Sequence, residues 1–126
     1  MRLVRIHAGD DGESRFEEVD LPMVAAGERS ATALVPAVST GFGFIEAREP
    51  QDWHPAPRRQ LVTVLGGALE IECAGGAVRR FGPGDSFIAD DLEGRGHVTR
   101  YPDGPVRLQY VLLPHDFEFG SPSKAP

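Results

Sequence analysis

Cysteine pairs, long apolar runs and a surplus of positive charge are all missing from this chain of 126 residues. The single cysteine, Cys73, has no partner for an intrachain disulfide, which favours a reducing compartment. No stretch approaches the ~20 consecutive apolar residues that a membrane-spanning helix needs. The first twenty residues carry charges throughout and lack the apolar segment of a secretory signal. These absences predict a cytoplasmic protein with no membrane partner.

The charge balance argues against a nucleic-acid partner. The chain has 13 Lys and Arg against 19 Asp and Glu, a net charge of −6, and its basic residues are scattered. Phosphate backbones are bound by concentrated positive charge, which this sequence does not offer. The length suits one hydrophobic core rather than two. We therefore expect a single domain over 1–119, with extension strands at its N-terminus, and a loose polar tail over 120–126.

Glycine and proline, 15 and 11 in number, divide the chain into short segments with little helical periodicity. The clearest strands flank the Gly66-Gly67 turn in 60–73, where apolar residues alternate with Glu70 and Glu72. Further strands are expected at 2–7, 15–23, 30–38, 41–48, 77–81, 86–89, 97–101 and 106–113, with a short helix left open within 21–30. Short strands at even spacing with turns between them indicate a sandwich or a barrel.

The segment that begins at His54 resembles the first sequence motif of the cupin superfamily, G-x5-H-x-H-x3–4-E-x6-G. His54 matches the first histidine and Gly67 matches the closing glycine. Ala56 stands where the second histidine would be, and Gln60 stands where the glutamate would be. The spacing of the motif is therefore kept, while two of its metal ligands are replaced.

A second segment resembles the other cupin motif, G-x5-P-x-G-x2-H-x3-N. Gly84 matches its opening glycine and Gly94-x2-His97 matches its centre, with two extra residues between them. Asp90 falls at the proline position, and Tyr101 replaces the asparagine. The resemblance implies an all-β fold, the cupin-type double-stranded β-helix or jelly-roll barrel, with six to ten strands. The chain is most similar to the small single-domain bacterial cupins.

The resemblance also implies where a metal would bind. Metal-binding cupins hold their ion with three imidazoles and one carboxylate, a ligand set that accepts Fe, Mn, Ni, Cu or Zn. In this chain the matched positions leave His54, His97 and Gln60 as metal ligands, with Asp90 as a nearby carboxylate. Because Gln60 supplies only a neutral oxygen and Ala56 supplies nothing, we expect a weak or absent metal site.

A metal-free chemistry is the other use of the same histidines. A histidine has an ordinary pKa of about 6.5, so His54 or His97 can act as a general base near neutral pH. Some sugar-nucleotide epimerases with cupin-like barrels work in this way. Here the predicted catalytic residues are His54, His97 and Tyr101, with Tyr110 as an alternative acid and Asp90 or Asp91 as an orienting partner.

Four residues are predicted to bind a ligand in the barrel lumen, and two of them were named above: Gln60, Trp53, Arg58 and Tyr110. Other features have plainer interpretations. The acidic group at 90–93 reads as a solvated loop, and the arginine pair at 58–59 reads as a surface turn. Cys73, which alternates with apolar residues, reads as a buried small hydrophobe rather than a nucleophile.

These expectations leave two classes of function. The first is an enzyme of the oxygenase, isomerase or lyase type that acts on a small molecule in the lumen, around His54 and His97. The alternative is a non-catalytic small-molecule binding or sensor module. In either case the N-terminal strands are expected to add to a sheet edge, and an exposed edge favours a homodimer.

Overall fold

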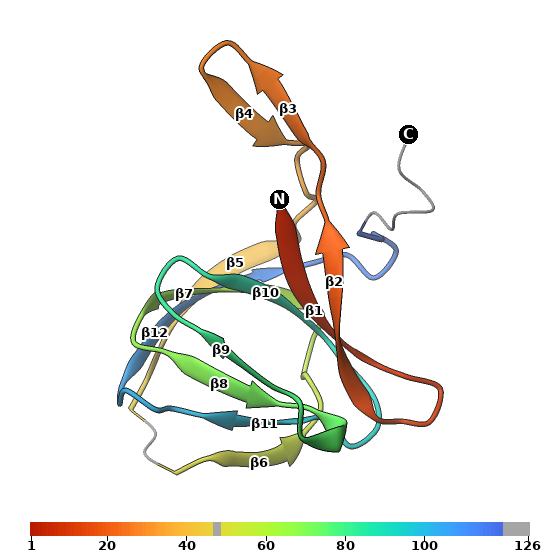
Figure 1. Cartoon of the computed structure of the whole chain (residues 1–126), viewed down its shortest axis with the longest axis vertical. Helices are drawn as coiled ribbons and strands as arrows, with labels where there is room; N and C mark the ends of the chain where they lie inside the picture. Colours follow the sequence, from red (N-terminus) through yellow and green to blue (C-terminus); the bar gives the residue numbers. More distant parts are fainter. Residues whose placement is uncertain (47–48, 120–126) are drawn as a thin grey trace.

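In the computed structural model of the chain, the described residues are 1–46 and 49–119, and nearly all of their regular structure is β (Figure 1). The strands are β1 (Arg2–Ala8), β2 (Ser14–Asp20), β3 (Met23–Ala26), β4 (Arg29–Thr32), β5 (Ser39–Ile45), β6 (Gln51–His54), β7 (Gln60–Gly66), β8 (Leu69–Glu72), β9 (Val78–Phe81), β10 (Ser86–Asp90), β11 (His97–Arg100) and β12 (Val106–Leu112). A single 3-10 turn, η1 (Ala74–Gly76), joins β8 to β9. Within these described ranges no helix has the length and apolar character needed to cross a membrane. The expected tail at 120–126 lies outside the described residues.

Eight strands, β5 to β12, form the barrel. The first strand of this series pairs antiparallel with the last, the second with the second last, and so on inward. β5 pairs with β12, β6 with β11, β7 with β10, and β8 with β9. This ribbon of pairs is rolled up, so that β12 also pairs with β7 and β11 with β8. The result is two sheets, in the orders β10-β7-β12-β5 and β6-β11-β8-β9. This is the topology of a jelly roll, so the predicted all-β jelly-roll architecture is confirmed.

The first two strands extend the larger sheet rather than the barrel itself. β1 pairs parallel with β10, with Val4 opposite Phe87, and β2 pairs antiparallel with β1. The larger sheet therefore has six strands, in the order β2-β1-β10-β7-β12-β5. The expectation that N-terminal strands add to a sheet edge is confirmed.

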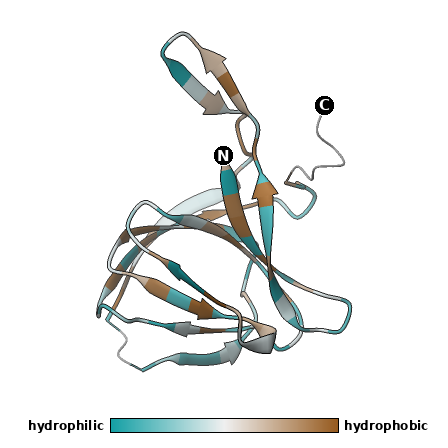
Figure 2. Cartoon of the chain, viewed as in Figure 1, coloured by the Kyte–Doolittle hydropathy of each residue, from teal (hydrophilic) through white to brown (hydrophobic). Residues whose placement is uncertain are grey.

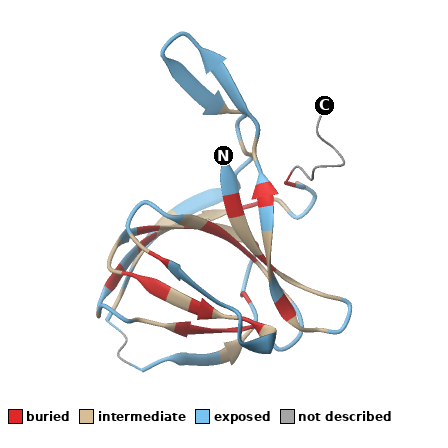
Figure 3. Cartoon of the chain, viewed as in Figure 1, coloured by how far each residue is buried: buried red, intermediate tan, exposed pale blue. Residues whose placement is uncertain are grey.

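Two hydrophobic clusters divide the interior (Figures 2 and 3). The main one lies between the sheets and takes residues from both of them: Ile6, Ala56, Val62, Val64, Leu69, Ile71, Cys73, Phe81, Phe87, Ala89, Val106 and Leu108. The second lies on the other face of the six-stranded sheet, where Ile88 packs with Leu3, Val19, Leu113 and Phe119. The alternation of strand residues explains both clusters, since Phe87 and Ile88 point to opposite faces of β10. The segment after β12 therefore covers part of the outer face.

A buried arginine fastens that C-terminal segment. The guanidinium of Arg59 donates to the carbonyl oxygens of Pro114, at 2.9 Å, and Phe117, and its Nε lies 3.2 Å from Asp90. Asp90 also binds Arg5 of β1 at 2.7 Å. Burial of Arg59 corrects the expectation of a surface turn at 58–59, which holds only for Arg58. A buried arginine is tolerated here because its donors find acceptors.

The structure differs from the expected strands in the N-terminal third. The helix left open within 21–30 is instead the β3–β4 hairpin. Its two-residue loop begins with Gly27 at a φ of 62°, the conformation that glycine supplies in tight hairpin turns. The strand expected over 30–38 ends at Thr32, and β6, at 51–54, was not expected at all. The end of the strand expected at 41–48 lies outside the described residues.

Cys73 has the environment expected of a small hydrophobe. Its side chain is fully buried in the main cluster. Burial, together with the nearby carboxylates of Asp91 and Glu72, raises the pKa of the thiol to about 12. A thiolate nucleophile at this position is therefore disfavoured at neutral pH.

The turn between β7 and β8 yields a stability prediction. Gly67 has a φ of 76°, and a Cβ there would overlap the carbonyl of Pro105, whereas Gly75 has a φ of 77° and open space around it. Gly75→Ala should lower the free energy of unfolding by about 1 kcal/mol, the penalty of a left-handed backbone. Gly67→Ala should lower it by about 3 kcal/mol or more, because steric overlap is added. If urea unfolding shows the same decrease in the free energy of unfolding for both variants, the close approach of Gly67 to Pro105 is contradicted.

Candidate functional site

A cavity of about 200 Å³ lies inside the barrel, between the two sheets. Its apolar wall consists of Ile45, Ala56, Pro57, Val62, Leu69, Ile71, Phe87, Ala89 and Leu108. Its polar groups belong to Gln51, His54, Gln60, His97, Thr99, Tyr101 and Tyr110. Among the described residues that line the cavity, none is an aspartate, glutamate, lysine or arginine. An apolar cavity with a few converging polar groups is typical of small-molecule sites.

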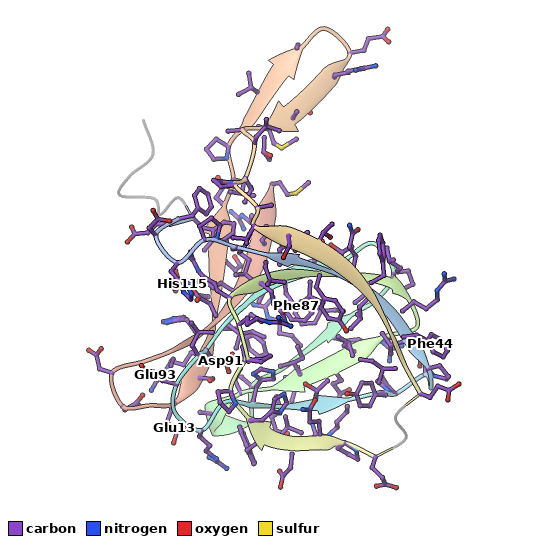
Figure 4. The ribbon with its side chains drawn as sticks, turned by 180° about the vertical axis from the view of Figure 1, so that it is seen from behind. Glu13, Phe44, Phe87, Asp91, Glu93 and His115 are labelled. Atoms are coloured by element: carbon purple, nitrogen blue, oxygen red, sulfur yellow. The ribbon has the colours of Figure 1, made fainter. Side chains whose placement is uncertain are left out.

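His97 is held on the cavity wall by a buried carboxylate. Its Nδ1 lies 2.6 Å from Oδ2 of Asp91, whose side chain is completely buried (Figure 4). The hydroxyl of Ser14, also fully buried, donates to the same oxygen at 2.7 Å. Since an ionised carboxylate only accepts hydrogen bonds, Nδ1 of His97 carries the proton, and in the neutral ring Nε2 has the lone pair. Carboxylate-bound imidazoles of this kind have a fixed tautomer and orientation.

The N-terminal hairpin brings Ser14 to this position. Its loop packs against the loop before β11, where the amide of Arg95 donates to the carbonyl of Gly12 at 3.1 Å and Glu13 bridges to Gly96. A side chain at Gly94 would overlap the backbone of Gly12. The backbones of the two loops are therefore in contact. This contact brings Ser14, at the start of β2, within hydrogen-bond distance of Asp91.

His54 faces His97 across the β6–β11 pair. The two residues are opposite in register, and their ring centroids lie 4.6 Å apart at an interplanar angle of 56°. Nδ1 of His54 lies 2.7 Å from the carbonyl oxygen of Asp52. A carbonyl can only accept, so this ring also carries its proton on Nδ1. Both predicted histidines thus lie together on the lumen, each with Nδ1 occupied by an acceptor.

Tyr101, Tyr110 and Gln60 complete the polar part of the lining. Burial, and to a lesser extent the neighbouring Tyr110, raises the pKa of Tyr101, so its phenol stays a hydrogen-bond donor at neutral pH. The ring of Tyr110 fits only because Gly43 on the adjacent strand has no side chain. Among the described residues, no protein group hydrogen-bonds the side chains of these three.

Two of the predicted ligand-binding residues lie elsewhere. Trp53 is not part of the cavity lining, and the guanidinium of Arg95 stacks 3.8 Å from its ring centroid. Arg58 is exposed and borders an outer groove that shares Gln60 and Tyr110 with the cavity. The structure therefore places Gln60 and Tyr110 in the lumen, Arg58 on the neighbouring outer groove, and Trp53 outside the cavity lining.

The acidic group at 90–93 is not the solvated loop that the sequence suggested. Asp91 is fully buried beside His97, and Asp90 is bound by Arg5 and Arg59 on the other face of the sheet. Asp91, rather than Asp90, is therefore the orienting partner. Asp90 is also absent from the cavity lining, so it does not complete a ligand set there.

Three polar residues of the site gave little or no signal in the sequence. Ser14 lies 77 residues from Asp91 along the chain, at the start of β2 and directly after a loop rich in charged and small residues. Gln51 and Thr99 reach the lumen because β6 and β11 pair, with a register shift between them. Local sequence patterns do not reveal which distant strands pair. Thr99 does follow His97 by two residues, so the two side chains share one face of the strand.

The donors in the lumen do not fit a tightly held divalent ion. Across residues 1–46 and 49–119, no three His, Cys, Asp or Glu side chains are grouped as metal ligands. His54 and His97 supply two neutral nitrogens and Gln60 a neutral oxygen, while the one nearby carboxylate, Asp91, is occupied by Nδ1 of His97. Without an anionic ligand the site cannot offset the charge of the ion.

Comparisons with known proteins add little to this description. No protein-family model and no curated protein matches the chain. A conserved Streptococcus pyogenes protein of unknown function is 21% identical, with a TM-score of 0.45 over 65% of this chain and 71% of that chain. A provisionally assigned mannose-6-phosphate isomerase from Ralstonia eutropha is 17% identical, with a TM-score of 0.40 over 90% and 86%. A provisionally assigned ethanolamine utilization protein Q from Salmonella typhimurium is 15% identical, with a TM-score of 0.42 over 92% and 98%. Likenesses this distant carry no functional inference, and the strand pairing of the chain itself defines the jelly roll.

The shared oxygen of Asp91 yields a second stability prediction. Asp91→Ala leaves the buried hydroxyl of Ser14 and Nδ1 of His97 without their acceptor, and should lower the free energy of unfolding by about 3 kcal/mol. Ser14→Ala removes one donor and should lower it by about 1 kcal/mol. Urea unfolding of both variants and of the double variant measures their coupling. Equal losses in the two single variants would mean that Asp91 does not organise this network.

The ligand set yields a prediction for metal binding. Ala56→His combined with Gln60→Glu would place three imidazoles and a carboxylate at the matched positions, and Ala56 already lines the cavity. Calorimetric titration with Ni²⁺ or Zn²⁺ should show one ion per chain, bound at least about 100-fold more tightly than by the wild type. Gln60→Glu alone is the matched control. Equally tight binding by the wild type would show that its own donors suffice.

Proposed function

We propose that this chain is a cupin-type protein whose barrel binds a small uncharged molecule and that His97 acts on it as a general base. The proposal is carried by one observation, the Ser14–Asp91–His97 chain of hydrogen bonds at the cavity wall. Burial of a carboxylate costs desolvation free energy. A buried carboxylate that orients an imidazole beside an apolar cavity is typical of sites where the imidazole transfers protons.

The size and lining of the cavity indicate the kind of ligand. A volume of about 200 Å³ somewhat exceeds the ~150 Å³ of an apolar cavity that binds benzene. The part of the lining that the structure describes offers donors and acceptors from Gln60, Tyr101 and Tyr110 and carries no fixed charge. A compact ring or short chain that carries a carbonyl or hydroxyl group suits both features.

Proton transfer next to a carbonyl is the chemistry that these groups support best. Nε2 of His97 takes a proton from the carbon, and the negative charge that develops moves to the carbonyl oxygen. The protonated phenol of Tyr101 and the amide of Gln60 are donors for that oxygen. Asp91 fixes the ring and stabilises the imidazolium that forms, as carboxylates do for catalytic histidines. Return of a proton from the imidazolium to the same carbon, after exchange with solvent, regenerates the ligand with that proton exchanged.

Nucleophilic catalysis fits the same residues less well. The hydroxyl of Ser14 donates to Asp91 and not to His97, so no base activates it. The thiol of Cys73 is buried, with its pKa raised to about 12. A serine or cysteine nucleophile needs an adjacent base or a lowered pKa. The general-base role of His97 is therefore the simplest use of the site.

Deuterium exchange tests this function directly. Cyclopentanone and cyclohexanone fit the expected size, and the exchange of their α-protons in D₂O is followed by proton NMR. The wild type should accelerate exchange, and His97→Gln should reduce the acceleration by about 10²–10⁴-fold. Asp91→Asn should lower the rate at saturating ketone more than it weakens binding, because Asp91 positions the base rather than the ligand.

Trp53→Phe is the matched control, since Trp53 lies outside the cavity and should leave the exchange rate unchanged. Chemical shifts of cavity residues report binding in the same samples. Binding without exchange in the wild type would favour the alternative, a non-catalytic binding or sensor module. If neither ketone binds nor exchanges, the assignment of a small carbonyl ligand is overturned.

A further inference from the structure

Two cross-strand pairs of polar side chains line the cavity, and the proposed function uses only one of them. His54 and His97 form the first pair, between β6 and β11, which lie side by side in the four-stranded sheet (Figure 1). Gln51 and Thr99 are opposite in register on the same two strands, and both line the same cavity. The second pair therefore faces the same ligand as the first.

A bulge in β6 brings Gln51 to the lumen. Side chains alternate between the two faces of a strand, so residues three apart, such as Gln51 and His54, normally point to opposite faces. Here the two steps from His97 to Thr99 along β11 lie opposite the three steps from His54 to Gln51 along β6. A bulge of this kind re-aims a side chain, and bulges are over-represented next to active sites. The shifted register thus places both β6 side chains in the cavity lining.

The side chains of Thr99 and Gln51 have no hydrogen-bond partner within residues 1–46 and 49–119. Thr99 is only 8% exposed, so its hydroxyl has little access to bulk water. Gln51 is exposed and also lines the cavity, which places it where the cavity meets solvent. A buried hydroxyl without a partner costs free energy, and a ligand oxygen in the cavity can supply the hydrogen bond. The pair thus offers a hydroxyl and an amide to a ligand.

The facing wall of the cavity lies on the six-stranded sheet and is largely apolar. Its apolar side chains are Val62, Phe87, Ala89 and Leu108. His97 and Thr99 are two residues apart on one face of β11, so the two polar pairs are separated by about 6.6 Å along the strands. A ligand that fits between these walls has an apolar body and polar groups at two positions along one edge.

We propose that Thr99 and Gln51 bind a second oxygen of the ligand, a hydroxyl group, so that the substrate class is a hydroxyketone rather than a simple ketone. This assignment rests on the proposed function, because that function places the carbonyl end of the ligand at His97. A hydroxyl across a six-membered ring from the carbonyl suits the spacing of the two pairs. Thr99 is then a specificity-determining residue and takes no part in proton transfer.

The affinities of three ketones test this assignment: cyclohexanone, 4-methylcyclohexanone and 4-hydroxycyclohexanone. Chemical shifts of cavity residues give each dissociation constant. The wild type should bind 4-hydroxycyclohexanone about 10-fold more tightly than 4-methylcyclohexanone, because the hydroxyl gains hydrogen bonds that a methyl group of similar size cannot make. Thr99→Val keeps the shape of the side chain and should remove this preference, whereas Thr99→Ser should keep it. Equal affinities in the wild type would overturn the assignment.

Thr63→Val is the matched control. Thr63 follows the lumen residue Val62 on β7, so it points away from the cavity, and its hydroxyl lies 2.7 Å from that of Ser86. This variant should keep the preference for 4-hydroxycyclohexanone. A preference that survives in Thr99→Val would show that Thr99 does not bind the hydroxyl group, which also overturns the assignment. Circular dichroism confirms that each variant is folded, and the wild-type series is decisive without the variants.

Deuterium exchange separates this assignment from the proposed function. A Thr99-dependent preference without any exchange would support the hydroxyl site and contradict the general-base role of His97. Exchange of cyclohexanone without any preference would overturn the hydroxyl site alone. If 4-hydroxycyclohexanone does not bind, the hydroxyketone class is overturned whatever the exchange of the other ketones shows.

Discussion

Burial of the Asp91 carboxylate is the constraint on which the rest of this structure depends. A charge removed from water must receive hydrogen bonds from the protein, and Oδ2 receives two, from Ser14 and from Nδ1 of His97. One donor comes from the N-terminal extension and the other from the barrel. The extension strands are therefore part of the site, although they are not part of the jelly roll.

Asp90, the residue before Asp91, also holds distant segments together, but on the opposite face of the sheet. Asp90 binds Arg5 of β1 and Arg59, and Arg59 in turn holds the carbonyls of Pro114 and Phe117. Successive residues of a strand point to opposite faces, so these two acids reach different surroundings. Together, Asp90 and Asp91 connect β1, the start of β2 and the segment at 114–117 to the end of β10. The N-terminal strands are thereby coupled to the orientation of His97 in the lumen.

Local patterns predicted the parts of this fold that local physics determines. The β7–β8 hairpin follows from the alternation around Gly66-Gly67, and the cupin-like spacing placed His54 and His97 in one lumen. The β3–β4 hairpin was missed because its Met, Ala, Glu and Arg residues favour helices, and only the Gly27-Glu28 loop indicates a turn. Contacts between distant segments, such as Ser14 with Asp91, have no local signal. The acids at 90–91 were misread for the same reason, since their partners lie far away in the sequence.

The second oxygen of Asp91 is what links stability to function in this barrel. Oδ1 is buried, and no described residue hydrogen-bonds it. Asp91 therefore carries a desolvation penalty at Oδ1, which the two hydrogen bonds to Oδ2 offset only in part. Its charge has one consequence that an amide lacks: it stabilises the imidazolium that appears when His97 accepts a proton. The proposed proton transfer makes use of that charge, whereas enclosing a neutral ligand does not.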